Sequence, residues 1–177
     1  MFRERLNTGK KERNLQHMKK STWHLTSVIL TVVCGDGIIK KLAEKKLAEQ
    51  PPKRVCGGKI ILNLLHNNGA ALGVLSREPR LLLVVNSALV GAAAGGLLAS
   101  DEQQIGKTAR MGLALAAGGG LSNLIDRLQR GYVTDYFSLD LGERFEKLKK
   151  VVFNVSDFCV FAGCILWCFQ HTSKSRP

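Results

Sequence analysis

The sequence lacks the motifs that mark several common classes of enzyme. Its five cysteines are an odd number without C-x-x-C spacing, and its four histidines include no H-E-x-x-H. Neither a disulfide framework nor a zinc hydrolase is therefore expected. A G-x-S-x-G motif is also missing, which argues against a serine hydrolase. We expect no metal site.

Acidic residues are scarce: 14 Asp and Glu stand against 26 Lys and Arg, for a formal net charge of +12. Such an excess suits nucleic acid, because clustered cations release counterions from phosphate. It suits anionic lipid headgroups equally well. The charges lie outside the apolar segments and no nucleic-acid recognition motif is present. We therefore expect membrane lipids as partners, and no nucleic acid.

Apolar residues, 45% of the chain, are gathered into four segments. The clearest is 81–99, which has no charged residue and approaches the ~20 residues needed to cross hydrocarbon. Its Gly91-x-x-x-Gly95 spacing predicts a close helix contact. The other apolar segments are 22–39, 111–127 and 151–170. The pattern predicts an all-α membrane protein, a four-transmembrane-helix bundle.

The polar segments between these runs predict smaller features. Residues 1–21 carry no apolar periodicity and are expected to form a disordered basic tail. The remaining predictions are a surface helix at 38–50, a short strand with an Asn/Gly turn at 59–73, and a polar loop with a surface helix at 128–150. The domain organisation expected is a tail at 1–21, a four-helix domain at 22–170 and a second tail at 171–177.

Carboxylates lie at the borders of the apolar segments. Asp36 lies near the end of the first, Asp126 nears the end of the third and Asp157 nears the start of the fourth. Because antiparallel spans alternate in direction, all three are expected at the membrane face opposite the termini. Asp135, in a predicted loop, falls on the same side. Counts of Lys and Arg leave open which face this is.

Two of these acids suggest hydrolytic chemistry. If the loop folds back, Asp135 meets Asp157, and two adjacent carboxylates retain one proton between them. One then acts as a general base on water and the other donates to the substrate carbonyl, as in aspartic proteases. Asn154, predicted one helical turn before Asp157, can hold a carboxylate or a substrate amide.

Other polar residues allow two interpretations. Asp126 beside Arg127 is expected to form an ion pair that anchors a helix end, with a catalytic role as the alternative. Arg127 can also present its planar fork to backbone carbonyls. The i,i+4 spacing of Asp36 and Lys40 predicts a structural pair.

Four strings in order carry a resemblance to a known family. They are Asp36-x-x-x-Lys40, NNGAALG at 67–73, GGGLSNLIDRLQRGYVTDYF at 118–137 and FNVSD at 153–157. Together they closely resemble lipoprotein signal peptidase, also called signal peptidase II. Three positions depart from the family pattern: Leu72 replaces an aromatic residue, Ser122 a glycine and Ser156 an alanine.

The resemblance implies an intramembrane aspartic endopeptidase that cleaves diacylglyceryl-modified prolipoproteins just before the lipidated cysteine. It implies that Asp135 and Asp157 are catalytic and that no cofactor is used. It also places the termini in the cytoplasm and the active site at the extracytoplasmic face of the bacterial cell membrane, beside a small β-containing loop region. We expect a monomer. Supporting or substrate-binding roles fall on Asn67, Gly69, Asn123, Arg127, Asn154, Asp36, Lys40 and Asp126.

Two other functions compete with this one. A small four-span transporter coupled to protons or cations also uses membrane carboxylates, but its acids would be expected near the middle of the bilayer. A structural membrane protein would use Asp residues only as helix caps and ion pairs. That second alternative explains Asp36 and Asp126 but leaves Asp135 and the Asn154/Asp157 pair without a purpose.

Overall fold

The computed structural model describes residues 2–69, 77–99 and 102–174. Its long helices are α1 (Phe2–Leu47), α2 (Pro79–Ala99), α3 (Glu102–Arg130) and α5 (Val155–Lys174). Its strands are β1 (Lys53–Val55), β2 (Ile60–Asn67) and β3 (Val133–Leu139), and its short helical segments are η1 (Cys56–Gly58), η3 (Glu143–Phe145) and α4 (Glu146–Lys149). A mostly helical fold with a small antiparallel sheet confirms the coarse fold prediction.

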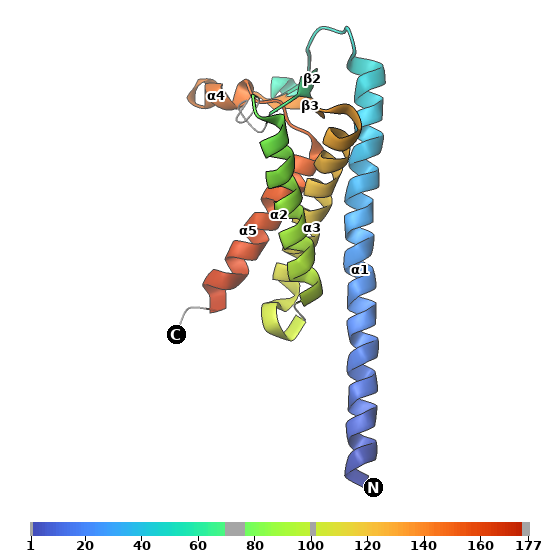
Figure 1. Cartoon of the computed structure of the whole chain (residues 1–177). Coiled ribbons are helices and arrows are strands. Elements are labelled where there is room, and N and C mark those ends of the chain that lie inside the picture. The colour runs from blue at the N-terminus through green and yellow to red at the C-terminus, as the bar shows by residue number, and fades with distance from the viewer. Residues whose placement is uncertain (1, 70–76, 100–101, 175–177) are drawn as a thin grey trace.

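The helices bring their polar ends together. α1 begins and α5 ends at one end of the molecule, whereas β2, β3 and α4 lie at the other end (Figure 1). The end of α1, the end of α3 and the start of α5 therefore meet near the sheet. This is the convergence of Asp36, Asp126 and Asp157 that the alternation of the apolar segments predicts.

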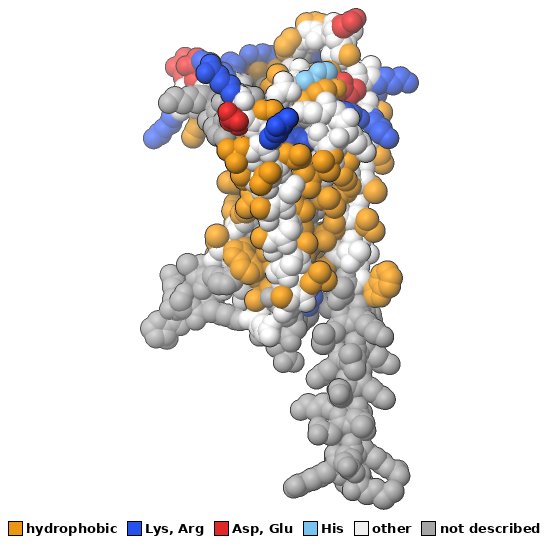
Figure 2. All heavy atoms as spheres, viewed as in Figure 1, with side chains coloured by type: hydrophobic (Ala, Val, Ile, Leu, Met, Phe, Trp, Pro, Cys, Tyr) orange, Lys and Arg blue, Asp and Glu red, His pale blue; other side chains and the backbone are white. Residues whose placement is uncertain are grey.

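Hydrophobic side chains cover the middle of the helices, and charged side chains gather at the sheet end (Figure 2). Each of the four long helices exposes large apolar side chains, among them Leu30, Leu89, Met111 and Phe161. Among the described residues, α2 is the one helix long and apolar enough to cross a membrane, and the apolar part of α5, Val155–Gln170, is shorter. The four-span layout thus stays a prediction.

Helix α3 is the centre of the bundle, since it packs against α1, α2 and α5. Glycines allow its close contact with α5. A side chain at Gly119 would collide with the backbone oxygen of Ser156, and a Cβ at Gly112 would lie 2.6 Å from the backbone oxygen of Gly163. Small residues of this kind let two helix backbones approach each other. The relative position of α3 and α5 is therefore tightly determined.

The helix contact predicted from Gly91 and Gly95 is wrong. Both glycines are exposed, and a Cβ added to either has nothing within 4 Å. Gly96 instead faces Leu113 of α3, at 3.4 Å from an added Cβ. Successive residues of a helix point about 100° apart, so a shift of one residue turns the spacing motif away from the neighbouring helix.

Helix α1 is longer than the sequence suggests. It starts at Phe2, so the tail predicted as disordered is helical, and the surface helix predicted at 38–50 is its continuation up to Leu47. Residues 2–21 are rich in Arg, Lys, Glu, Gln and Leu, which favour helices once an adjoining segment has nucleated one. The first proline of the chain is Pro51, and the helix ends shortly before it.

The sheet has the order β1-β2-β3 with antiparallel pairing. β2 confirms the strand predicted near residue 60, whereas residues 70–73 of the predicted turn lie outside the described residues. β3 was not predicted: residues 128–150 were expected to form a loop with a surface helix. α4 confirms a short helix there, but Asp135 lies on β3, opposite Leu65. The β-branched and aromatic residues of Val133–Leu139 favour a strand.

Candidate active site

The backbone of Phe153 places β3 beside the start of α5. The N–H groups of Tyr136 and Phe137 both donate to the Phe153 oxygen, at 2.9 and 3.1 Å, and the Phe153 N–H donates to the Phe137 oxygen at 2.7 Å. Asp135 therefore lies close to the residues that follow Phe153. Asp135 is 1% exposed, and Asp157, in the first turn of α5, is half-buried.

Asn154 joins the two carboxylates. Its side-chain NH2 donates to Asp135 Oδ1 at 2.6 Å, and its backbone N–H donates to Asp157 Oδ2 at 3.0 Å. The structure thus brings Asp135 and Asp157 to one site, as the sequence predicts, with one asparagine linking them.

Asn154 and Asp157 also start helix α5. The Asp157 N–H donates to Asn154 Oδ1 at 2.9 Å while the Asn154 N–H donates to Asp157 Oδ2. These reciprocal bonds form a capping box, which satisfies two N–H groups at the helix start. The spacing predicts that Asn154 lies within the helix, one turn before Asp157. It precedes the first helical residue, Val155, because asparagine favours the cap position.

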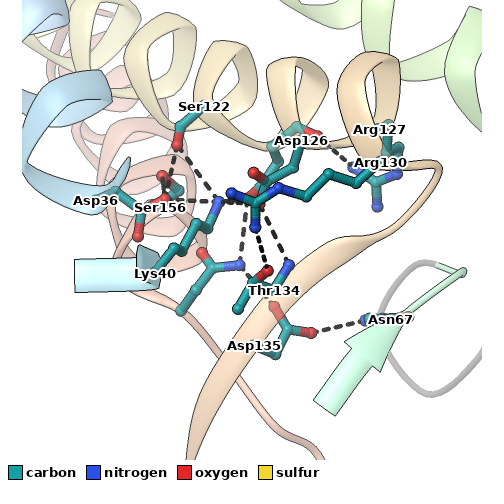
Figure 3. Close-up of polar contacts among 12 residues, drawn as sticks. Asp36, Lys40, Asn67, Ser122, Asp126, Arg127, Arg130, Thr134, Asp135 and Ser156 are labelled. Atoms are coloured by element: carbon teal, nitrogen blue, oxygen red, sulfur yellow. Dashed lines mark hydrogen bonds and ion pairs between the residues drawn. The ribbon is translucent and has the colours of Figure 1, made fainter. Parts of the chain in front are cut away.

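Two further asparagines hold the acids from other elements. The side-chain NH2 of Asn67, at the end of β2, donates to Asp135 Oδ2 at 2.8 Å (Figure 3). The NH2 of Asn123, on α3, donates to Asp157 Oδ1 at 2.9 Å. The Gly69 N–H donates to Asn67 Oδ1 at 2.9 Å, which orients the amide. All three asparagine amides in the site therefore turn their NH2 groups toward the acids.

Arg127 binds backbone carbonyls, as one of the sequence interpretations proposes. Its guanidinium donates to the Gly69 oxygen at 2.9 Å and to the Asn123 oxygen at 3.3 Å. The predicted ion pair between Asp126 and Arg127 is wrong, since Asp126 Oδ2 pairs with Lys40 Nζ at 3.0 Å and accepts from the Thr134 N–H at 3.2 Å. Adjacent residues on a helix do not face each other.

Lys40 and Asp36 form the predicted structural pair at 2.7 Å, and each is 1% exposed. Around this pair lie hydroxyl groups for which the sequence predicts no role. Ser122 and Ser156 both donate to Asp36 Oδ2, at 2.7 and 2.6 Å. The Tyr136 hydroxyl donates to Asp36 Oδ1 at 3.2 Å and accepts the Val155 N–H at 2.9 Å. Their positions in the sequence are a signal that could have identified the two serines: Ser122 precedes Asn123 and Ser156 precedes Asp157, which are both predicted site residues.

Burial is the main cause of the raised pKa values of two residues on β3, Asp135 and Tyr136. The pKa of Asp135 is raised from 3.8 to about 7, first by burial and then by the charge of Asp157, against the hydrogen bonds from Asn67 and Asn154. Burial also raises the pKa of the Tyr136 hydroxyl, which therefore stays protonated and can donate. Within the described residues, no group of three or more His, Cys, Asp or Glu side chains is arranged to hold a metal ion.

Comparisons with known proteins agree with the resemblance seen in the motifs. The family described as signal peptidase (SPase) II matches residues 28–172. The lipoprotein signal peptidase of Clostridioides difficile strain 630 is 34% identical over 152 residues, covering 84% of this chain and 97% of the relative. That of Moorella thermoacetica is 32% identical over 143 residues, covering 80% and 87%.

A solved structure titled as a bacterial membrane enzyme has a TM-score of 0.70 with this chain at 21% identity, and covers 86% of this chain and 92% of the other. A second has a TM-score of 0.69 at 23% identity. At these identities the likeness concerns the fold. The transporter alternative receives no support, because the family match and the named relatives are peptidases. The chain belongs to the signal peptidase II family, whose members remove signal peptides from lipoproteins.

Proposed function

We propose that this signal peptidase works by aspartic chemistry, with Asp135 and Asp157 as its two acids. The observation that carries the proposal is a pair of carboxylates from β3 and α5, linked through Asn154 and held by asparagine NH2 groups. The raised pKa of Asp135 keeps one proton on the pair near neutral pH. Two acids that share a proton can activate water without a nucleophilic side chain.

In the proposed reaction, ionised Asp157 takes a proton from a water molecule while the water oxygen attacks the scissile carbonyl carbon. Asp135 gives its proton to the carbonyl oxygen, so the intermediate is a neutral gem-diol. When the C–N bond breaks, Asp157 passes its proton to the amine nitrogen and Asp135 takes a proton back from one hydroxyl. The products are a carboxylic acid and an amine, and the pair again holds one proton.

Arg127 is proposed to bind the substrate backbone. Two of its nitrogens donate to the oxygens of Gly69 and Asn123, but its Nε is buried and has no hydrogen-bond partner among the described residues. An unsatisfied buried donor costs about 1–3 kcal/mol, so a ligand that supplies an acceptor is favoured there. A peptide carbonyl next to the scissile bond has this chemistry.

The proposed substrates are prolipoproteins whose cysteine carries a diacylglyceryl group, cleaved just before that cysteine. The names of the relatives support this class. We also propose that α1, α2, α3 and α5 all cross the membrane of a bacterium, with cytoplasmic termini and with the acids at the extracytoplasmic face. The apolar side chains exposed on all four helices support this arrangement. A monomer contains both proposed acids.

The test is cleavage of a lipidated precursor by purified protein in detergent, comparing wild type with Asp135→Asn and Asp157→Asn. Each variant is expected to lose turnover while remaining folded. Asp140→Asn is the matched control, because Asp140 lies just after β3 and pairs with Arg54 and Lys149 away from the site. Turnover near wild type in either acid variant would reject the aspartic mechanism, and turnover abolished by EDTA would point to a metal.

A further inference from the structure

We propose that Lys40 is a positioning residue of this peptidase, which fixes the orientation of the Asn123 amide and thereby turns its NH2 group toward Asp157. The inference rests on the proposed function, because it concerns how one of the two proposed acids is held. Lys40 lies on α1 and is 1% exposed. Its polar contacts reach Asp36, Ser122, Asn123 and Asp126, so it acts on Asp157 through another side chain.

The ammonium group leaves Asn123 one favourable orientation. A lysine ammonium has three donors and no acceptor, so only an oxygen can face it. Asn123 Oδ1 lies 2.8 Å from Lys40 Nζ and also accepts the NH2 of Asn154 at 3.2 Å. The NH2 of Asn123 consequently points the other way, to Asp157 Oδ1 at 2.9 Å. If the amide were flipped, its NH2 group would face the Lys40 ammonium and its oxygen would face the Asp157 carboxylate, and neither contact would be a hydrogen bond.

The ammonium is itself held in place. Asp36 Oδ2 lies 2.7 Å from Lys40 Nζ and Asp126 Oδ2 lies 3.0 Å from it, and the Asn123 oxygen and, at 3.4 Å, the Ser122 hydroxyl complete its surroundings. Asp36 Oδ2 in turn accepts the hydroxyls of Ser122 and Ser156 (Figure 3). The two serines hold Asp36, and Asp36 holds Lys40.

The orientation matters for the reaction. The NH2 of Asn123 and the backbone N–H of Asn154 donate to Asp157, and both hydrogen bonds favour its ionised form, the form required of the general base. A flipped Asn123 would place an oxygen beside this carboxylate and would favour its protonated form. Through Asn123, Lys40 therefore favours the arrangement in which Asp135 and not Asp157 carries the proton.

The test compares two variants that both remove the charge. Lys40→Gln keeps an NH2 group that can face Asn123 Oδ1, whereas Lys40→Met has none. If Lys40 orients the amide, kcat for the lipidated precursor should be about 10-fold to 100-fold lower in Lys40→Met than in Lys40→Gln, with similar KM, which corresponds to one hydrogen bond to a charged group. The acidic limb of the pH–rate profile should move to higher pH in Lys40→Met alone.

Lys41→Met is the control, since Lys41 is exposed on the next position of α1 and should behave as wild type. If the Lys40 variants do not fold, Asn123→Asp provides a second test. It keeps an oxygen for Lys40 but has no NH2 for Asp157, so it should reproduce the lowered kcat and the shifted acidic limb.

Equal kcat and equal pH profiles for Lys40→Gln and Lys40→Met would overturn the inference, as would an Asn123→Asp variant with a wild-type profile. Failure of the aspartic mechanism is recognised separately, because Asp135→Asn would then retain turnover whatever the Lys40 variants do.

Discussion

Ionisation of Asp135 should destabilise the protein as the pH rises from about 4 to about 7. The pKa of this buried carboxyl is raised from 3.8 to about 7. Below pH 4 the group is protonated in the folded and the unfolded chain, so it adds no pH dependence there. Between the two values the unfolded chain releases the proton and the folded protein keeps it, so each step in pH favours unfolding. Above pH 7 both states are ionised and the slope ends.

The size of the effect follows from the two pKa values. The difference between 3.8 and about 7, at about 1.4 kcal/mol for each pH unit, amounts to about 4 kcal/mol. Asp135 is 1% exposed, so solvent screening reduces this little. The same titration should produce a basic limb near pH 7 in the rate of cleavage, because the proposed proton donor is lost there.

The assay is unfolding of the purified protein in detergent, followed by tryptophan fluorescence at several values between pH 4 and pH 8. Asp135→Asn should flatten the pH dependence, since an amide does not ionise. Asp140→Asn should keep it, because ion pairs with Lys149 and Arg54 lower the pKa of Asp140 and its titration falls below this range. The same slope in wild type and Asp135→Asn would refute the reasoning.

Further substitutions test the cap of α5, the helix packing and the ion pairs of Lys40. Asp157→Asn and Asp157→Ala should both be inactive, because each removes the proposed acid. The asparagine keeps an oxygen for the capping box and the alanine does not, so the free energy of unfolding in denaturant should be about 1–3 kcal/mol lower for the alanine variant. Gly119→Ala should lose about 1–3 kcal/mol of stability through overpacking against α5, whereas Gly35→Ala, with open space, should gain up to about 1 kcal/mol; equal melting temperatures would contradict this. Asp126→Asn removes one of the two carboxylates of Lys40 and should weaken folding by about 1–3 kcal/mol while cleavage of the precursor persists.

The sequence predicts which residues meet better than it predicts how they are held. Alternation of the apolar segments is enough to bring Asp36, Asp126 and Asp157 to one end of the bundle, because a helix that crosses the bundle must return in the opposite direction. The i,i+4 rule likewise gives the Asp36–Lys40 pair. Both inferences depend on local periodicity, which can be read directly from the sequence.

The errors arise where a long-range contact decides. β3 forms because it pairs with β2 and with Phe153, and neither partner is apparent from the polar composition of the loop. The motifs place Asn123 in the site, but the orientation of its amide depends on Lys40, which lies far away in the sequence. The glycine contact was assigned to the wrong residues because a spacing motif does not say which face of the helix has a neighbour.

The glycine packing of α3 against α5 has a consequence for the spacing of the two proposed acids. α3 carries Asn123 and α5 carries Asp157. Because the two helix backbones pack closely, the positions of these two residues relative to each other are fixed. Asp135 lies instead on strand β3, which is held by backbone hydrogen bonds to β2 and to Phe153. The spacing of the two acids is therefore adjustable only from the sheet side. Displacement of Phe153 from β3 should therefore separate the two proposed acids and stop cleavage.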